Sequence, residues 1–297
     1  MRISNTQFSE NALNSINRAF SRYDAAQRQL STGKRIQTPS DDPAGVAQSL
    51  GLRNRLDEVA QFGRVMEQAK SFLGATDNAL SSTTELIRKA RTLGVQGTSD
   101  ALSEDGRNAI VQELDEVLKS MASTGNASYG SRYLFGGQRT DAPPFRAEGD
   151  HFIYQGGSTA TGDGEIRLDI ARGESMVLNA PGDKTLSPAM EAVIKLRDNV
   201  ANKRLLTISN EDFPRLDNAL SQVSRQRAEI GAKTQRLDQT LQRNEAIQIN
   251  FTERLANIED ADIPKTIVEF QSAQTAYQAA LQSTAKVGNI SLLDYLR

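Results

Sequence analysis

Residues 59–94 read VAQFGRVMEQAKSFLGATDNALSSTTELIRKARTLG, and apolar or small residues recur in this stretch at alternating intervals of three and four. The positions that follow this alternation are Val59, Phe62, Met66, Ala69, Leu73, Thr76, Leu80, Thr83, Ile87, Ala90 and Gly94. Such a stripe stays in line over many helical turns only when the helix supercoils against another helix. The stretch therefore predicts a long helix packed against a second long helix.

A later stretch has the same spacing and supplies that second helix. Its positions are Leu216, Leu220, Val223, Arg227, Ile230, Thr234, Leu237, Leu241, Asn244, Gln248, Phe251, Leu255 and Ile258. Four of these positions are polar, namely Arg227, Thr234, Asn244 and Gln248. Asn244 and Gln248 are either solvated or fix the register of the helix pair, and the sequence leaves both interpretations open. We predict a mainly α-helical protein built around a long coiled-coil rod.

Both ends of the chain carry weaker apolar stripes. Their polar faces are rich in Gln, Ser and Asn, so each helix alone would be marginally stable in water. We expect the two helices to pair with each other and with other subunits. The candidate assembly residues are Ile16, Ala19, Tyr23, Leu30, Ile263, Ile267, Phe270, Tyr277 and Leu281. Of these, Phe270 and Leu281 are expected to be largely dispensable in the free monomer.

Several short motifs predict where helices begin and end. Ser40, Asp41, Asp42 and Pro43 form a helix start, in which one of the two carboxylates caps the free N–H groups and Pro43 occupies the first turn. The preceding helix is expected to end at Gly33 and a further helix to start at Ser103. A capping box at residues 209–212 predicts the start of the second long helix.

The pattern changes after residue 129, where glycines and prolines separate short alternating runs at 152–155, 165–170 and 175–178. Alternation at a period of two between turn residues predicts β-strands. We therefore divide the chain into an N-terminal assembly helix at 1–42, rod segments at 43–134 and 183–261, a small β domain at 135–182 and a C-terminal assembly helix at 262–297.

Composition argues against several classes of function. The chain has 35 basic and 37 acidic residues, a balance that gives no electrostatic signature of nucleic-acid binding. It has no cysteine, which excludes disulfides, zinc thiolates and thiol nucleophiles. No apolar run reaches the roughly 18 residues of a membrane span, and residues 1–9 lack the apolar segment of a cleaved signal peptide. We expect no membrane insertion.

No residue pattern predicts a catalytic, cofactor or metal site. His151 is the only histidine and is interpreted as a surface residue of a strand. Asp260 and Asp262 lack the remaining spacing of a calcium loop, and the Gly-Gly pairs at 136–137 and 156–157 lack the context of a phosphate-binding loop. The adjacent carboxylates at 41 and 42 could form a cation site, but capping explains them better. We predict a protein that is not an enzyme and needs no cofactor.

Four segments resemble a known family. Residues 30–43, LSTGKRIQTPSDDP, are similar to the N-terminal signature of the flagellin superfamily, in the form carried by its hook–filament junction members. Residues 132–137, RYLFGG, with Pro144 and Phe145, resemble the entry into that family's small β domain, and residues 182–184 resemble its exit. Residues 291–296, SLLDYL, look like its C-terminus. The chain is identified as a member of this superfamily over its whole length.

The resemblance implies an antiparallel helical rod with an inserted β domain, and a structural subunit of the bacterial flagellum. The subunit would form the junction between a hook-associated ring and the flagellin filament, and would be needed for filament attachment and motility. It would be extracellular and exported without a cleaved signal peptide. Implied partners are other copies of the chain in a ring, a neighbouring hook-associated protein, flagellin, the flagellar export apparatus and a possible export chaperone.

Two alternatives stay open at this point. Flagellin itself shares the terminal helices, although the Lys34 and Arg35 form of the turn, residues 133–137 and the C-terminal residues favour the junction members. A binding or adhesive module carried on a helical rod is the second alternative, with its site in the β domain.

Overall fold

The computed structural model describes residues 2–99, 101–149, 151–158 and 160–295, and the fold is mainly helical, as predicted. The chain forms two compact units. The first contains Met1–Glu58 and Ala246–Arg297, and the second contains Val59–Glu245. Two long helices, α2 (Pro43–Gly97) and α7 (Phe213–Glu259), contribute to both units.

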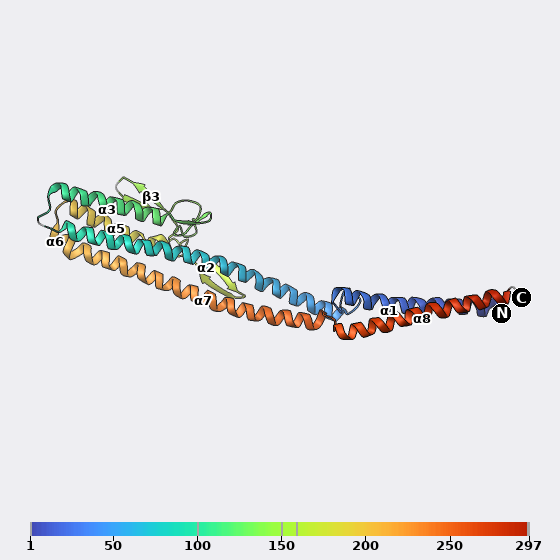
Figure 1. Cartoon of the computed structure of the whole chain (residues 1–297). Helices are drawn as coiled ribbons and strands as arrows, with labels where there is room; N and C mark the ends of the chain where they lie inside the picture. Colours follow the sequence, from blue (N-terminus) through green and yellow to red (C-terminus); the bar gives the residue numbers. More distant parts are fainter. Residues whose placement is uncertain (1, 100, 150, 159, 296–297) are drawn as a thin grey trace. The chain divides into compact units, whose positions relative to one another are not determined.

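The first unit pairs the two terminal helices, α1 (Arg2–Thr32) and α8 (Ile263–Tyr295). They lie side by side and antiparallel (Figure 1). The expected helix boundaries are present: Gly33 follows α1 with a φ of 68°, and α2 begins at Pro43. A positive φ is the conformation in which glycine commonly ends a helix. The first unit therefore draws on segments from both ends of the sequence.

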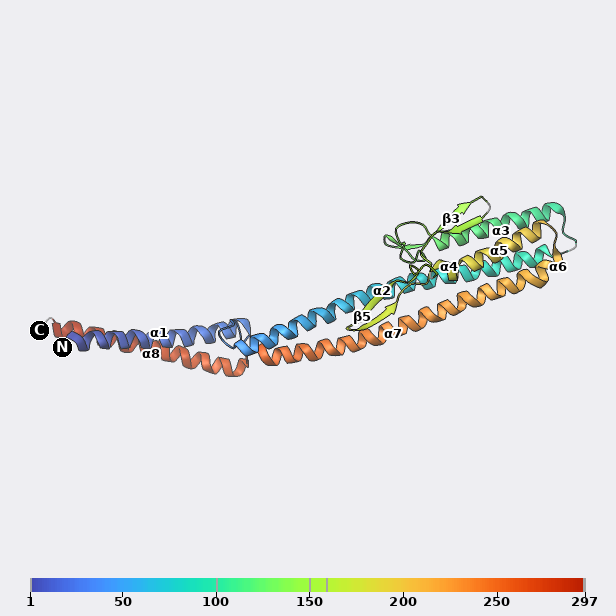
Figure 2. The ribbon, with the colours of Figure 1, turned by 180° about the vertical axis from the view of Figure 1, so that it is seen from behind.

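The second unit is a helical bundle. The rest of α2 and α7 lies alongside α3 (Glu104–Gly125) and α5 (Ser187–Ala201), as both views show (Figures 1 and 2). The predicted seams face the bundle core: Leu73 and Leu80 of α2, and Val223 and Leu237 of α7, are fully buried. Leu114 of α3 joins them. The prediction of long antiparallel helix pairs is confirmed.

The polar positions of the α7 seam differ in environment. Arg227 donates from Nε and Nη2 to the Asp77 carboxylate of α2, at 2.8 and 3.1 Å. Asn244 is buried, whereas Gln248 is exposed. Of these last two residues, the solvated interpretation therefore applies to Gln248 only.

In the described residues, the β-strands form three separate antiparallel hairpins. The hairpins are β1 (Ser128–Tyr129) with β2 (Arg132–Tyr133), β3 (Phe145–Glu148) with β4 (His151–Tyr154), and β5 (Arg167–Ala171) with β6 (Glu174–Val177). The runs at 152–155, 165–170 and 175–178 correspond to β4, β5 and β6. The alternating pattern did not indicate β1, β2 or β3.

Isolated two-stranded hairpins are marginal in water, so each needs packing against other elements. Phe145 of β3 is buried, and its backbone N–H and carbonyl both bond to the Asn126 side chain at 2.8 Å. The β5–β6 hairpin lies beside α7 (Figure 2), where Glu174 accepts hydrogen bonds from Arg236 and Arg243 at 2.7 and 3.0 Å. The β3–β4 hairpin is thus anchored to the residue that follows α3, and the β5–β6 hairpin is anchored to α7.

The capping box predicted at residues 209–212 is wrong. The chain is already helical there, with α6 (Leu205–Thr207) followed by a π-helical turn, η1 (Ile208–Asp212), that leads into α7. Asp212 is fully buried and accepts hydrogen bonds from Asn199 Nδ2 at 2.8 Å and Arg215 Nη1 at 3.1 Å. Because α6, η1 and α7 follow one another without a break, no helix begins at residues 209–212 and no cap forms there. The Ser103 cap does form: its hydroxyl accepts the Gly106 N–H at 3.1 Å.

Candidate assembly surface and the joint beside it

Aromatic rings connect α1 to α8 within one chain. The Tyr23 ring of α1 packs against Phe270 and Tyr277 of α8, with centroid separations of 5.2 and 5.9 Å. Phe20 also contacts Tyr277, at 5.6 Å. The expectation that Phe270 is largely dispensable in the monomer therefore conflicts with its contact to Tyr23 of the same chain.

The predicted assembly residues fall into two groups. Those that are partly buried are Ile16, Ala19, Tyr23, Leu30, Phe270 and Tyr277. Those that are exposed are Ile263, Ile267 and Leu281, at 40 to 42%. Further large apolar side chains on the same helices are also exposed and were not among the predicted residues, namely Leu13, Phe20 and Val268. The α1–α8 pair thus uses part of its apolar surface internally and leaves part uncovered.

The turn between α1 and α2 pairs with the turn between α7 and α8. The Arg35 N–H donates to the Glu259 carbonyl at 2.6 Å, and the Ala261 N–H donates to the Gly33 carbonyl at 2.9 Å. Lys34 and Asp260 form an isolated antiparallel bridge between these bonds. The two turns therefore meet as a very short β-ladder, although their sequence positions are far apart.

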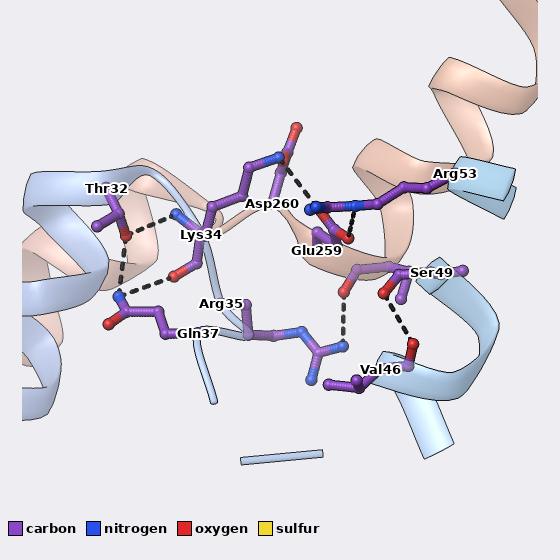
Figure 3. A network of polar contacts seen from close by, with 10 residues as sticks. Thr32, Lys34, Arg35, Gln37, Val46, Ser49, Arg53, Glu259 and Asp260 are labelled. Carbon is purple, nitrogen blue, oxygen red and sulfur yellow. Dashed lines mark hydrogen bonds and ion pairs between the residues drawn. The ribbon is translucent and has the colours of Figure 1, made fainter. Parts of the chain in front are cut away.

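A buried carboxylate, that of Glu259, lies in the centre of this joint (Figure 3). Arg53 of α2 donates from Nε to Oε1 at 3.1 Å and from Nη2 to Oε2 at 2.7 Å. This two-point pairing is the strongest geometry between a guanidinium and a carboxylate. Lys34 Nζ lies 3.4 Å from Oε2 of the same carboxylate. The Arg53 hydrogen bonds, with smaller contributions from Ser49 and Lys34, hold the pKa of Glu259 below its ordinary value.

Exposed charges surround the Glu259 carboxylate. Lys34 Nζ bonds Asp260 Oδ1 at 2.6 Å, and this hydrogen bond raises the pKa of Lys34. Arg35 Nη2 donates to the Ile258 carbonyl, in the last turn of α7, at 2.8 Å and lies 3.4 Å from Asp42 Oδ2. The guanidinium of Arg35 therefore links the C-terminal end of α7 to the N-terminal end of α2.

The residues predicted to form the helix start have separate roles. Asp42 Oδ1 accepts the Gly45 N–H at 2.9 Å, and this bond lowers the pKa of Asp42. Asp41 Oδ2 instead accepts the N–H groups of Gln37 and Thr38, at 3.0 and 2.8 Å, and Thr38 contributes most to the lowered pKa of Asp41. The Ser40 hydroxyl lies 2.7 Å from that of Thr38, and Pro43 is the first residue of α2.

Sequence reasoning did not find Arg53 and Glu259, which are 206 residues apart. Arg53 precedes the first seam position and Glu259 follows the last one, so the heptad pattern gave no reason to select either. The described residues contain no group of His, Cys, Asp and Glu side chains that could hold a metal ion, and His151 lies exposed at the start of β4. Within the same residues, no helix has the length and apolar character needed to cross a membrane.

Two family models match this chain over most of its length. The bacterial flagellin N-terminal helical region matches residues 3–140, and the bacterial flagellin C-terminal helical region matches residues 214–296. The chain belongs to the flagellin family. It is a structural protein of the bacterial flagellum and not an enzyme. The two matched regions include α2, α3 and α8 and all but the first residue of α1 and of α7.

Individual relatives within the flagellin family are distant. The chain is 25% identical over 291 residues to flagellar hook-associated protein 3 of Escherichia coli, covering 89% of this chain and 90% of the relative. It is 29% identical over 290 residues to flagellin of Bacillus subtilis, covering 91% of each. A solved putative flagellar hook-associated protein from Vibrio parahaemolyticus superposes with a TM-score of 0.67 at 19% identity, over 74% of this chain and 100% of that one. This last likeness shows a shared fold.

Proposed function

We propose that this flagellin-family protein is the subunit that joins the hook to the filament of the bacterial flagellum. The observation that carries the proposal is the turn at 30–43, whose Lys34 and Arg35 resemble the junction form of the family signature. The same two residues bond to Asp260 and to the end of α7. Similarity to hook-associated protein 3 along nine-tenths of both chains supports the same choice.

Partners and location follow from this proposal. The subunit would assemble with copies of itself in a ring, between another hook-associated protein and the first layer of flagellin. It would reach the extracellular flagellum through the flagellar export apparatus, without a cleaved signal peptide and with a possible export chaperone. The terminal helices at 1–42 and 262–297 would form the assembly contacts, and the exposed Ile263, Ile267 and Leu281 would contribute to them.

Flagellin is the second candidate, because the Bacillus subtilis flagellin is slightly more similar by identity. The two functions differ in where secreted flagellin is found. A strain that lacks the gene should be examined by electron microscopy, and its medium should be assayed for flagellin.

The junction function predicts intact hooks without filaments, and unattached flagellin in the medium. Loss of the filament protein itself would leave hooks with no flagellin outside the cell, and this result would favour the flagellin candidate. Re-expression of the intact gene should restore filaments and motility in either case.

A further inference from the structure

The joint between α1, α2, α7 and α8 has little apolar packing of its own. From Gly33 to Asp42, Ile36 is the only side chain that is buried. In the second turn, between α7 and α8, Asp260 and Asp262 are exposed, and Ile263 at the start of α8 is 40% exposed. Apolar burial, the usual source of rigidity between elements, is therefore small at this point.

Charged groups supply the contacts that apolar residues do not. We define the clasp as Lys34, Arg35, Arg53, Glu259 and Asp260, the charged residues of the joint, all labelled in Figure 3. Their contacts join α2 to α7, the first turn to the second turn, and the first turn to the end of α7. Each contact therefore crosses between chain segments that are remote in sequence.

The residues of the clasp differ in how much their contacts contribute to stability. Lys34 and Asp260 are exposed, and exposed ion pairs contribute little in water. Glu259 is 4% exposed, and a buried carboxylate that loses its cation is left with an uncompensated charge. Glu259 therefore dominates the clasp, because its carboxylate makes a two-point bond to Arg53 of α2 and also lies 3.4 Å from Lys34 Nζ of the first turn.

We infer that the clasp is a charge-held latch that fixes the direction in which α1 and α8 leave the adjoining ends of α2 and α7. Glu259 is the central residue of the latch, because Arg53 and Lys34 both lie against its carboxylate. When Glu259 loses its charge, Arg53 and Lys34 are no longer drawn together, and the α1–α8 pair can move as a body about the two turns. The inference concerns the free chain and does not depend on which flagellar role the protein has.

Distance measurements between two spin labels test the latch directly. The native chain has no cysteine, so Ser21→Cys on α1 and Asn54→Cys on α2 provide two unique, exposed labelling sites within the first unit. With Glu259 in place, we expect a narrow distance distribution. Glu259→Gln should broaden it, with circular dichroism unchanged.

Hydrogen exchange at the Arg35 and Ala261 amides provides a second measurement on the unlabelled protein. Losing charge-assisted hydrogen bonds should speed this exchange by roughly tenfold or more in Glu259→Gln. Arg53→Gln should have an effect at least as large, because it leaves the buried Glu259 carboxylate without its two-point partner and with only the more distant Lys34 as a cation. Combining both changes should be no worse than Arg53→Gln alone.

Two control variants separate the latch from general loss of stability. Asp238→Asn removes the exposed Lys70–Asp238 ion pair between α2 and α7, at 2.7 Å, and should leave both measurements unchanged. Ile36→Val trims the one buried apolar side chain of the first turn and should change them much less than Glu259→Gln does. A narrow distribution and unchanged exchange in Glu259→Gln would overturn the inference. Loss of helical circular dichroism in that variant would also overturn it, because Glu259 would then be required for the fold itself.

Discussion

Asp41 and Asp42 are neighbouring carboxylates with distinct partners. Asp42 caps the N-terminal end of α2, whereas Asp41 bonds backward to two N–H groups of the preceding turn. The sequence predicted a cap at this pair but could not say which residue provides it, because the two carboxylates are adjacent and both lie just before the helix start at Pro43. The choice depends on the path of the turn, which the pairing with residues 259–261 determines.

Removing the cap should destabilise the first unit by a measurable amount. Asp42→Ala should lower the free energy of unfolding by about 1 kcal/mol, through loss of the bond to the Gly45 N–H and of the interaction with the helix dipole. Asp42→Asn keeps an accepting oxygen and should cost less. Thermal unfolding followed by circular dichroism measures both, and equal melting of Asp42→Ala and the native protein would contradict the capping role.

The buried carboxylate should make the stability of the joint depend on pH. Arg53, Ser49 and Lys34 lower the pKa of Glu259 below its ordinary value of 4.5. A lowered pKa in the folded state means that the stabilisation is fully present above 4.5 and is lost as the pH falls through the folded value. The difference in free energy of unfolding between the native protein and Glu259→Gln should therefore be constant near neutral pH and shrink in acid. A difference that grows as the pH falls would contradict the assignment.

At the scale of elements, the α1–α8 pair is held by rings that the sequence had placed at contacts between subunits. Phe270→Asp should reduce the stability of the pair in the free monomer, by about 1 to 3 kcal/mol, because a charge would replace a ring packed on Tyr23. Leu281→Asp, at an exposed position of the same helix, is the matched control and should leave the monomer unchanged. Brief protease treatment of both purified variants measures the difference, since a weakened pair exposes α1 and α8 to cleavage.

The α2–α7 seam contains a buried polar side chain, Asn244, whose amide nitrogen lacks a hydrogen-bond partner among the described residues. Asn244 is 8% exposed. A buried polar residue at such a position costs stability and can fix register. Asn244→Leu should therefore raise the melting temperature. If Asn244 also sets register, the variant should populate more than one arrangement of Arg227 relative to Asp77. The coupling energy between these two residues, measured by a double-mutant cycle, should then be smaller than in the native protein. A lower melting temperature would contradict this account.

Periodicity predicted the elements well and their polar connections poorly. The long seams are heptad patterns, which are set by residues close together in the sequence, so α2 and α7 could be predicted from the sequence. Strand β3 was missed because only its first residue, Phe145, is buried, so it shows no alternation; it is held instead by the side chain of Asn126, the residue that follows α3. The capping box was wrong because α6 and η1 already make residues 205–212 helical. The clasp was missed because its two sides are far apart in sequence and meet only in the folded chain.

At the scale of the whole molecule, the two units differ in the number of chain segments that build them: the first contains two segments and the second contains one. The second unit is one continuous segment, residues 59–245, and it contains the large buried core of the bundle. We expect a fragment of residues 59–245 to fold alone, with a cooperative thermal transition and helical circular dichroism. The first unit needs both ends of the chain, so removal of residues 1–42 should also leave α8 open to proteolysis. A fragment that stays unfolded would contradict this division.

The ladder between the two turns has a consequence for the order of events during synthesis. Lys34 and Asp260 are separated by 226 residues, so α1 leaves the ribosome long before its partner exists. A weakly amphipathic helix alone is marginal, and closing so large a loop is slow relative to local helix formation. The bundle of residues 59–245 can mature first. The clasp and the α1–α8 pair then form last, after release of the complete chain. Until then the N-terminal segment has no helix to pair with.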